Sequence, residues 1–195
     1  MDLLVADLLD LARLEAGVGE EVREAVDWRA LAHHSIRRFE PLFRDAGLTL
    51  AGPPDPGPEG PATPVPVLGN PRRLEQLLDN LLRNALRYVP RGKGVTVRVE
   101  RRDGRAILTV EDDGPGFAAS DLPRIFDRFY RGDRARTSEG TGLGLALVRE
   151  IARLHGGSAS AENRPEGGAR LRVDLPALPG GEPEEVEPEE VEPPV

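Results

Sequence analysis

The chain has 195 residues, 38% of them hydrophobic, and no cysteine. This length suits one domain with extensions, and the lack of cysteine excludes disulfide frameworks, thiolate metal sites and cysteine nucleophiles. The net charge of −8 is unevenly distributed, because residues 180–195 hold seven Glu and no Lys or Arg, which leaves −1 for the rest. A nearly neutral body gives no reason to expect a nucleic-acid groove.

No run of the sequence approaches the roughly 20 apolar residues that cross a bilayer. Asp2, Asp7 and Asp10 lie where a secretion signal would carry positive charge. We therefore expect no membrane segment in this chain and a cytoplasmic location.

The first predicted helix covers residues 2–15, where leucines recur at helical spacing and two glycines follow. A helix this short is marginal alone, so we expect a partner helix. Asp27 is a good cap for a second helix that reaches about residue 45. Pro41 lies inside that helix and is expected to bend it.

Residues 52–66 are rich in proline and predict a surface loop between short strands. Asn70 and Pro71 form an N-cap and first-turn signature, which opens a helix with a leucine stripe that ends at Tyr88.

The rest of the body alternates between strand and helix patterns. Residues 95–100 and 105–112 alternate in strand fashion and predict a hairpin. A helix follows over 142–154, and strands 158–164 and 169–176 pair across a glycine turn. The chain is therefore predicted to be an α+β sandwich of helices on a sheet.

Three polar segments of this body are candidates for chemistry. In the first, Asn80 and Asn84 lie four residues apart on one helix, with Arg87 a turn further on. Amide oxygens placed in this way suit Mg²⁺, which takes its other ligands from water and substrate phosphates. The alternative is an ordinary polar helix edge.

The second segment is a strand that ends in Asp112 and Asp113 and runs into Gly114, Pro115 and Gly116. A carboxylate at a strand end can accept a hydrogen bond from an exocyclic amine, and glycines let backbone approach a flat ring. Ordinary turn chemistry explains the same residues.

The third segment places Gly140, Gly142 and Gly144 before a helix. The free N–H groups and positive dipole end of that helix can hold phosphate. The pattern is neither a P-loop nor a dinucleotide fingerprint, and a plain helix cap remains the alternative.

Together with IFDRFYR at 125–131, these segments resemble the catalytic ATP-binding domain of sensor histidine kinases, in the superfamily of gyrase-type and Hsp90-type ATPases. The resemblance covers about residues 20–176. The matching positions are Asn80 and Asn84 for the asparagine box, Asp112, Gly114 and Gly116 for the first glycine box, Phe126, Phe129 and Arg131 for the phenylalanine box, and Gly140, Gly142 and Gly144 for the second glycine box.

The resemblance implies a two-layer α/β sandwich of the Bergerat type, with a mixed, mostly antiparallel sheet and helices on one face. Residues 1–17 would be the end of a helix from a dimerisation and phosphoacceptor hairpin. Residues 18–179 would be the catalytic domain, and residues 180–195 a disordered tail of Glu and Pro.

The resemblance also implies roles for individual residues. Asp112 would receive the adenine amino group, while Asn80 and Asn84 hold Mg²⁺ and Arg87 and Arg131 face phosphate; these last four form the catalytic set. The nucleotide-binding set is Asn84, Tyr88, Asp112, Gly114, Gly116, Phe126, Phe129, Gly140, Thr141, Gly142, Leu143 and Gly144. Residues 116–140 would form a lid anchored by the two phenylalanines, and the cofactors would be ATP and Mg²⁺.

The implied reaction transfers the γ-phosphoryl group of ATP to a histidine on a hairpin domain missing from this chain. The expected partners are that hairpin, in the same protein or in trans, and a response regulator; dimers would form only through the hairpin, and the full-length kinase could be membrane-anchored. An amide at Asn80, where gyrase-type relatives have glutamate, favours kinase chemistry over hydrolysis. None of the three histidines (His33, His34 and His155) is expected to receive phosphate.

Two alternatives stay open. A serine kinase of the anti-sigma type shares the nucleotide pocket, and a non-catalytic module would use nucleotide only to set an interaction surface.

Overall fold

The computed structural model describes residues 2–15, 23–53, 63–132 and 140–179. The elements in chain order are α1 (Asp2–Glu15), β1 (Glu24–Asp27), α2 (Trp28–Asp45), β2 (Thr49–Ala51), β3 (Pro66–Gly69), α3 (Pro71–Tyr88), β4 (Gly94–Arg102), β5 (Arg105–Asp112), η1 (Leu122–Arg124), α4 (Gly144–Leu154), β6 (Ser158–Asn163) and β7 (Ala169–Pro176). The tail 180–195, the two glycines expected to end the first helix and residues 133–139 of the expected lid lie outside the described residues.

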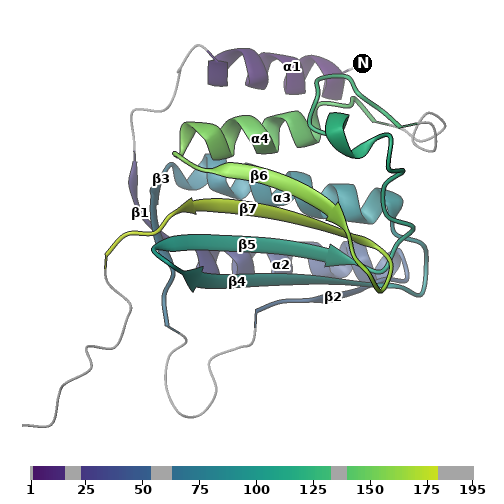
Figure 1. Ribbon diagram of the computed structural model, residues 1–195, viewed down its shortest axis with the longest axis horizontal. Coiled ribbons are helices and arrows are strands. Elements are labelled where there is room, and N and C mark those ends of the chain that lie inside the picture. Colours follow the sequence, from purple (N-terminus) through teal and green to yellow (C-terminus); the bar gives the residue numbers. More distant parts are fainter. Residues whose placement is uncertain (1, 16–22, 54–62, 133–139, 180–195) are drawn as a thin grey trace, which may run out of the picture.

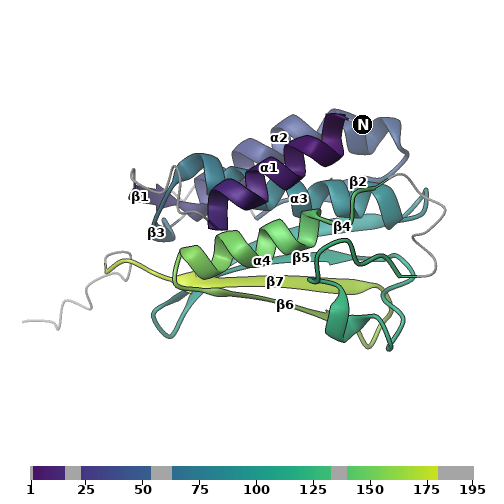
Figure 2. The same cartoon turned by 90° about the horizontal axis from the view of Figure 1, so that it is seen from above.

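Five strands form one sheet in the order β2-β4-β5-β7-β6, in which only the β2–β4 pair is parallel (Figure 1). Helices α1, α2, α3 and α4 lie on one side of it (Figure 2). The predicted α+β class, with a mixed and mostly antiparallel sheet, is confirmed. β1 and β3 pair separately as a two-stranded antiparallel sheet.

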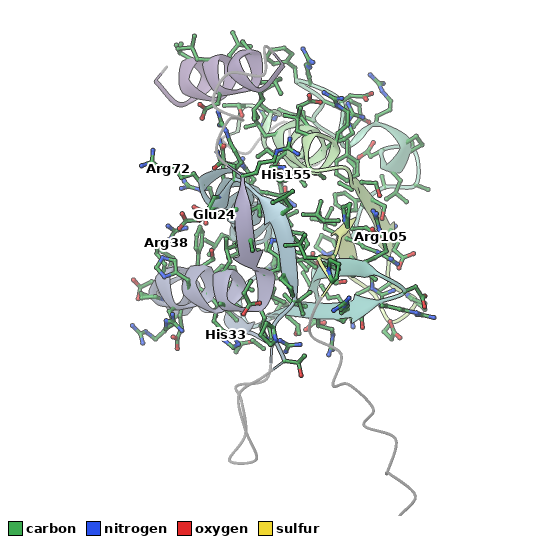
Figure 3. The ribbon with its side chains drawn as sticks, turned by 90° about the vertical axis from the view of Figure 1, so that its left-hand side faces the viewer. Glu24, His33, Arg38, Arg72, Arg105 and His155 are labelled. Atoms are coloured by element: carbon green, nitrogen blue, oxygen red, sulfur yellow. The ribbon has the colours of Figure 1, made fainter. Side chains whose placement is uncertain are left out.

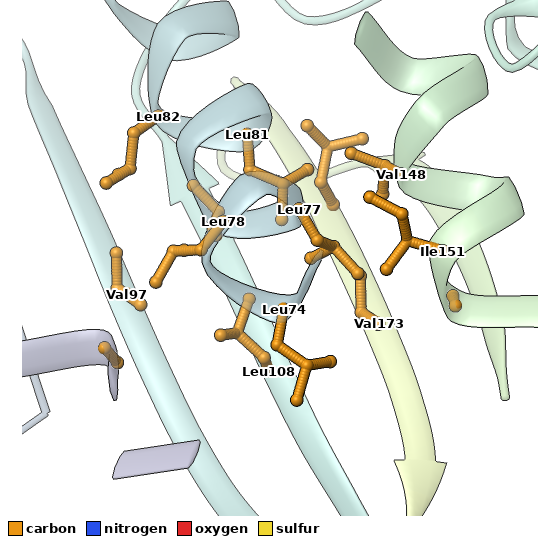
Figure 4. Packing of buried hydrophobic residues seen from close by; sticks show 14 of the residues in the cluster. Leu74, Leu77, Leu78, Leu81, Leu82, Val97, Leu108, Val148, Ile151 and Val173 are labelled. Atoms are coloured by element: carbon orange, nitrogen blue, oxygen red, sulfur yellow. The ribbon is translucent and has the colours of Figure 1, made fainter. Parts of the chain in front are cut away.

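Helix α3 supplies the centre of the core. It begins where predicted, because the Asn70 side chain accepts hydrogen bonds from the backbone N–H groups of Arg72 and Arg73, at 3.0 and 3.3 Å. Its leucine stripe is buried against β4, β5, β7 and α4 (Figure 4), through Leu74, Leu77, Leu78, Leu81 and Leu82. This packing fixes the face of α3 that carries the asparagines.

Helix α2 follows its predicted cap, and the cap has a second partner. Asp27 Oδ1 accepts from the N–H groups of both Arg29 and Val65, each at 3.0 Å, so it also holds the far end of the proline-rich loop. The helix continues through Pro41 to Asp45.

One strand was not predicted, and one helix begins later than predicted. β1 was not expected from Glu24–Asp27, where Val26 is the only buried residue of a four-residue strand. α4 begins at Gly144 and not at 142, because Gly142 has φ +71°, a left-handed conformation that a right-handed helix does not contain.

The sheet face opposite the helices is charged. Glu111 accepts from Arg170 at 2.6 Å and from Arg98 at 3.4 Å, and Arg172 pairs with Asp174 at 3.0 Å on the same face. Burial alone would raise the pKa of Glu111, but the two arginines outweigh it and hold that pKa below its ordinary value. Because these charged side chains cover it, this face of the sheet is compatible with exposure to water.

Helix α1 packs against α4, as the expected partner helix. Leu11 and Leu14 are buried there, while Val5, Leu8 and Leu9 point away and are about half exposed. Within the described residues, no helix combines the length and hydropathy needed to span a bilayer.

Candidate functional site

Asp112 stands at the end of β5 with one carboxylate oxygen saturated. Oδ1 accepts from the N–H groups of Gly114 at 2.8 Å and Ala169 at 3.3 Å. No residue in the described part of the chain hydrogen-bonds to Oδ2. The carboxylate is therefore fixed in orientation and keeps one oxygen available for a donor from outside the protein.

Burial raises the pKa of Asp112 above its ordinary value, against the opposing effect of the two N–H groups and of Arg164. A carboxylate that is desolvated and still hydrogen-bonded is typical of a binding site.

The hairpin of β6 and β7 holds the turn that follows Asp112. Asn163 pairs with the backbone of Phe117 through both amide atoms, accepting from N–H and donating to C=O at 2.8 Å each. Arg164 Nη1 donates to the Asp112 carbonyl and to Asp113 Oδ1, each at 2.9 Å. Sequence analysis did not identify Asn163 and Arg164 as site residues. They belong to no recognised motif, and their partners are distant in the sequence.

Asn80 and Asn84 lie one turn apart on α3, and Asn80 is beside the start of α4. Asn80 Nδ2 donates to the Gln76 carbonyl at 2.9 Å, and its Oδ1 is 3.1 Å from the position that a Cβ on Gly144 would occupy. No group among the described residues hydrogen-bonds to the amide of Asn84. Amide oxygens one turn apart on a helix are ligands that suit Mg²⁺ together with phosphate.

The second glycine segment is folded tightly onto Phe129. Gly142 and Phe129 both have left-handed backbone, with φ +71° and +61°, and Phe129 N–H donates to the Gly142 carbonyl at 3.0 Å. A Cβ on Gly142 would lie 2.9 Å from Phe129 Cα, so only glycine fits. Leu143 N–H donates to Thr141 Oγ1 at 3.3 Å.

Helix α4 starts beside the end of α3. Leu143, at its N-cap, makes no side-chain cap hydrogen bond, so the first turn presents N–H groups that an anion can bind. A Cβ on Gly140 would collide with the Arg87 guanidinium, so this cation lies directly beside Gly140 in the second glycine segment. Tyr88, next along α3, is half-buried.

The two predicted anchoring phenylalanines differ from each other. Phe126 packs on the core, but Phe129 is 55% exposed, so Phe129 holds its segment through its backbone. Arg131 is half-buried.

His33 and His34 are on α2, and His155 is at the end of α4 opposite Gly144. His155 is buried, with Nδ1 2.7 Å from the Ile151 carbonyl and Nε2 accepting from Asn70 N–H at 3.1 Å, and it joins the end of α4 to the start of α3 (Figure 3). Within residues 2–15, 23–53, 63–132 and 140–179, no three His, Asp or Glu side chains gather into a metal cluster.

Comparison with known proteins gives one family match, "Histidine kinase-, DNA gyrase B-, and HSP90-like ATPase", over residues 69–179. The sensor protein SphS of Synechococcus elongatus is 43% identical over 186 residues, which cover 90% of this chain and 43% of SphS. The sensor histidine kinase CpxA of Escherichia coli K12 is 39% identical over 181 residues, 90% of this chain and 37% of CpxA. The chain thus spans less than half the length of these relatives.

Solved structures agree in fold. Full-length ShkA in complex with AMPPNP superposes with a TM-score of 0.74 at 28% identity, covering 91% of this chain and 36% of ShkA. The histidine kinase AdeS of Acinetobacter baumannii gives 0.69 at 28% identity, covering 90% of this chain and 77% of the AdeS chain.

Proposed function

The chain belongs to the family of histidine kinase-, DNA gyrase B- and HSP90-like ATPases, and we propose that it binds ATP with Mg²⁺ as the catalytic domain of a sensor histidine kinase. The observation that carries the proposal is Asp112, a partly desolvated carboxylate whose Oδ1 is saturated while Oδ2 has no partner in the described part of the chain. Oδ2 suits the amino group of adenine.

The triphosphate is assigned to the groups between α3 and α4. Arg87 beside Gly140 and the uncapped first turn of α4 supply positive charge for the phosphates. Asn80 and Asn84 would hold Mg²⁺, which neutralises charge on the β- and γ-phosphates when bound. Tyr88, the glycines and the residues from Phe126 to Arg131 would complete the pocket.

The proposed reaction breaks the bond between the γ-phosphorus and the oxygen that bridges to the β-phosphate. A bond forms from phosphorus to an imidazole nitrogen of the acceptor histidine, and ADP leaves. Positioning and charge neutralisation dominate such transfers, so the residues named here need no nucleophile of their own.

The acceptor is assigned to a histidine hairpin, in the same protein or in trans, and the next recipient to a response regulator. CpxA, at 39% identity, is named a sensor histidine kinase, which favours histidine over serine as the acceptor. ATP and response regulators are cytoplasmic, so we assign the reaction to that compartment.

The binding test is calorimetric titration with ATP, with and without Mg²⁺, of the wild type and of Asp112→Asn. We expect Mg²⁺ to strengthen binding and the folded variant to lose at least about 100-fold in affinity, since a donor amide replaces the acceptor. A folded wild type that ignores ATP would refute the proposal.

The transfer test adds labelled ATP and a separately prepared histidine hairpin from a kinase. Phosphate on the hairpin that is stable to base and labile to acid supports a histidine kinase. An acid-stable product would favour a serine kinase, and tight ATP binding with no transfer would favour the interaction module.

A further inference from the structure

The turn that carries Asp112 has one internal hydrogen bond within the described residues, from the Gly114 N–H to Asp112 Oδ1 at 2.8 Å. We call residues 112–117 the Asp112 turn. Gly114 and Gly116 flank Pro115 within it, and Gly116 has φ +67°. Pro115 therefore restricts the backbone at one position, while the glycines on either side do not. Groups from the β6–β7 hairpin, 46 to 57 residues later in the chain, provide further support.

Asn163 supports the far end of this turn. Its amide exchanges two hydrogen bonds of 2.8 Å with the backbone of Phe117, as a neighbouring strand would do. A Cβ on Gly116 would lie 2.6 Å from Asn163 Oδ1, so the contact is close and leaves room only for glycine.

Arg164 supports the near end. Its side chain is 19% exposed, and Nη1 reaches both the Asp112 carbonyl and Asp113 Oδ1 at 2.9 Å. Its positive charge also opposes the rise that burial causes in the pKa of Asp112, against the negative charge of Asp113. Arg164 therefore acts on both the position and the ionisation of the carboxylate.

We propose that Asn163 and Arg164 are positioning residues that set the purine selectivity of this site, an inference that rests on the proposed ATP-binding function. An ionised, fixed carboxylate accepts from a 6-amino group and repels a 6-carbonyl oxygen. A carboxyl that takes up a proton donates to that carbonyl instead, and a carboxylate that can rotate no longer holds its free oxygen against it. Releasing the Asp112 turn therefore lowers discrimination against hypoxanthine or guanine.

The experiment compares ATP with inosine triphosphate, in which a carbonyl replaces the 6-amino group. The readout is the ratio of the two Kd values, measured by calorimetry for the wild type, Arg164→Gln and Asn163→Ala. We expect the preference for ATP to fall about 10-fold in each variant, the size of one lost charge-assisted hydrogen bond. Arg164→Lys and Asn163→Asp, which each retain one of the interactions, should fall between.

Arg172→Gln is the matched control, because Arg172 is an arginine of the same hairpin that pairs with Asp174 on the charged sheet face. It should keep the wild-type ratio. A purely structural role for Asn163 and Arg164 would weaken both nucleotides equally and leave the ratio unchanged, which would overturn the inference.

The two proposals fail in different ways. A wild type that binds neither nucleotide refutes ATP binding, and the inference with it. A wild type that prefers ATP, with variants that keep this preference, refutes only the inference. If Arg164→Gln does not fold, the two Asn163 variants decide the question.

Discussion

At the scale of single residues, Asp112 is placed where it weakens the fold. Burial raises its pKa, so keeping it ionised near neutral pH costs folding free energy. A turn residue selected for stability alone would be better as an amide or an exposed carboxylate. The cost is typical of a group retained for binding.

This cost predicts a pH dependence of unfolding. Between the ordinary value of 3.8 and the raised folded pKa, the native state binds more protons at Asp112 than the unfolded state. Relative to Asp112→Asn, the wild type should therefore lose unfolding free energy as the pH rises through that window, and keep a constant difference above it.

Urea unfolding of both proteins at a series of pH values, without nucleotide, measures this difference. Asn keeps the Oδ1 acceptor for Gly114 and Ala169, so the comparison isolates the charge. A wild type that gains stability over the variant as the pH rises would contradict the assignment of burial as the dominant effect.

At the scale of elements, the asparagines and the second glycine segment meet because α3 and α4 are held in register at their other ends. His155 closes α4 and accepts from the backbone N–H of Asn70, which caps α3. The same ring contacts the Ile151 carbonyl through Nδ1. One buried side chain thus connects two helices whose opposite ends carry the groups proposed to bind phosphate.

Replacing His155 by Leu should lower the free energy of unfolding by about 1–3 kcal/mol, because the Asn70 N–H loses this acceptor in a partly buried place. His34→Gln is the control, since the His34 side chain is 64% exposed and surface changes stay within about 0.5 kcal/mol. Denaturant unfolding of the two variants compares them directly. Equal stabilities would show that the ring only fills space.

The core of α3 gives a second stability prediction. Leu78 is fully buried between the helices and the sheet (Figure 4), so Leu78→Ala should cost about 2–5 kcal/mol. Leu42 on α2 is 53% exposed, and Leu42→Ala should change little. Thermal unfolding would separate the two, and a mild effect at Leu78 would mean that the core collapses around the missing atoms.

The sequence predicted those parts of the fold whose signals are local. The Asn70 cap with its leucine stripe predicts α3, and strict alternation predicts β4 and β5. The short strand β1 was not predicted, because Val26 is its one buried residue and gives no alternating pattern. Its pairing with β3 depends on a partner about 40 residues away, which periodicity does not reveal.

The candidate site also has residues that local sequence signals predict and residues that they do not. The asparagines and glycines are recognisable from spacing along the chain. Asn163 and Arg164 are polar residues near a turn, and their contacts with the Asp112 turn exist only after β7 pairs with β5. The exposure of Phe129 and its left-handed backbone were likewise not predictable from local spacing.

At the scale of the whole molecule, α1 is a lightly attached part of the fold. Leu11 and Leu14 bury against the other helices, and Gln76 on α3 donates to Asp10 at 3.0 Å. The core that these two leucines join contains many more residues from the remaining helices and the sheet. Local opening free energies follow the amount of buried contact, so α1 should open well before the rest.

Leu14→Asp tests this hierarchy, because a charge at a fully buried position of α1 should release that helix. Native-state hydrogen exchange should show loss of protection in α1, with α3 and β5 unchanged within about 0.5 kcal/mol. A loss of protection spread over the whole sheet would instead show that α1 belongs to the cooperative core.

The distance along the chain between Asp112 and its supports has a consequence for biosynthesis. A ribosome releases the chain from its N-terminus, so Asp112 emerges well before Asn163, Arg164 and Ala169, the residues that orient it. If Asp112 binds the nucleotide as proposed, the chain should acquire its nucleotide affinity late in translation. A nascent chain halted within β6 would already contain the asparagines and both glycine segments, yet would lack the groups that aim the carboxylate at its ligand.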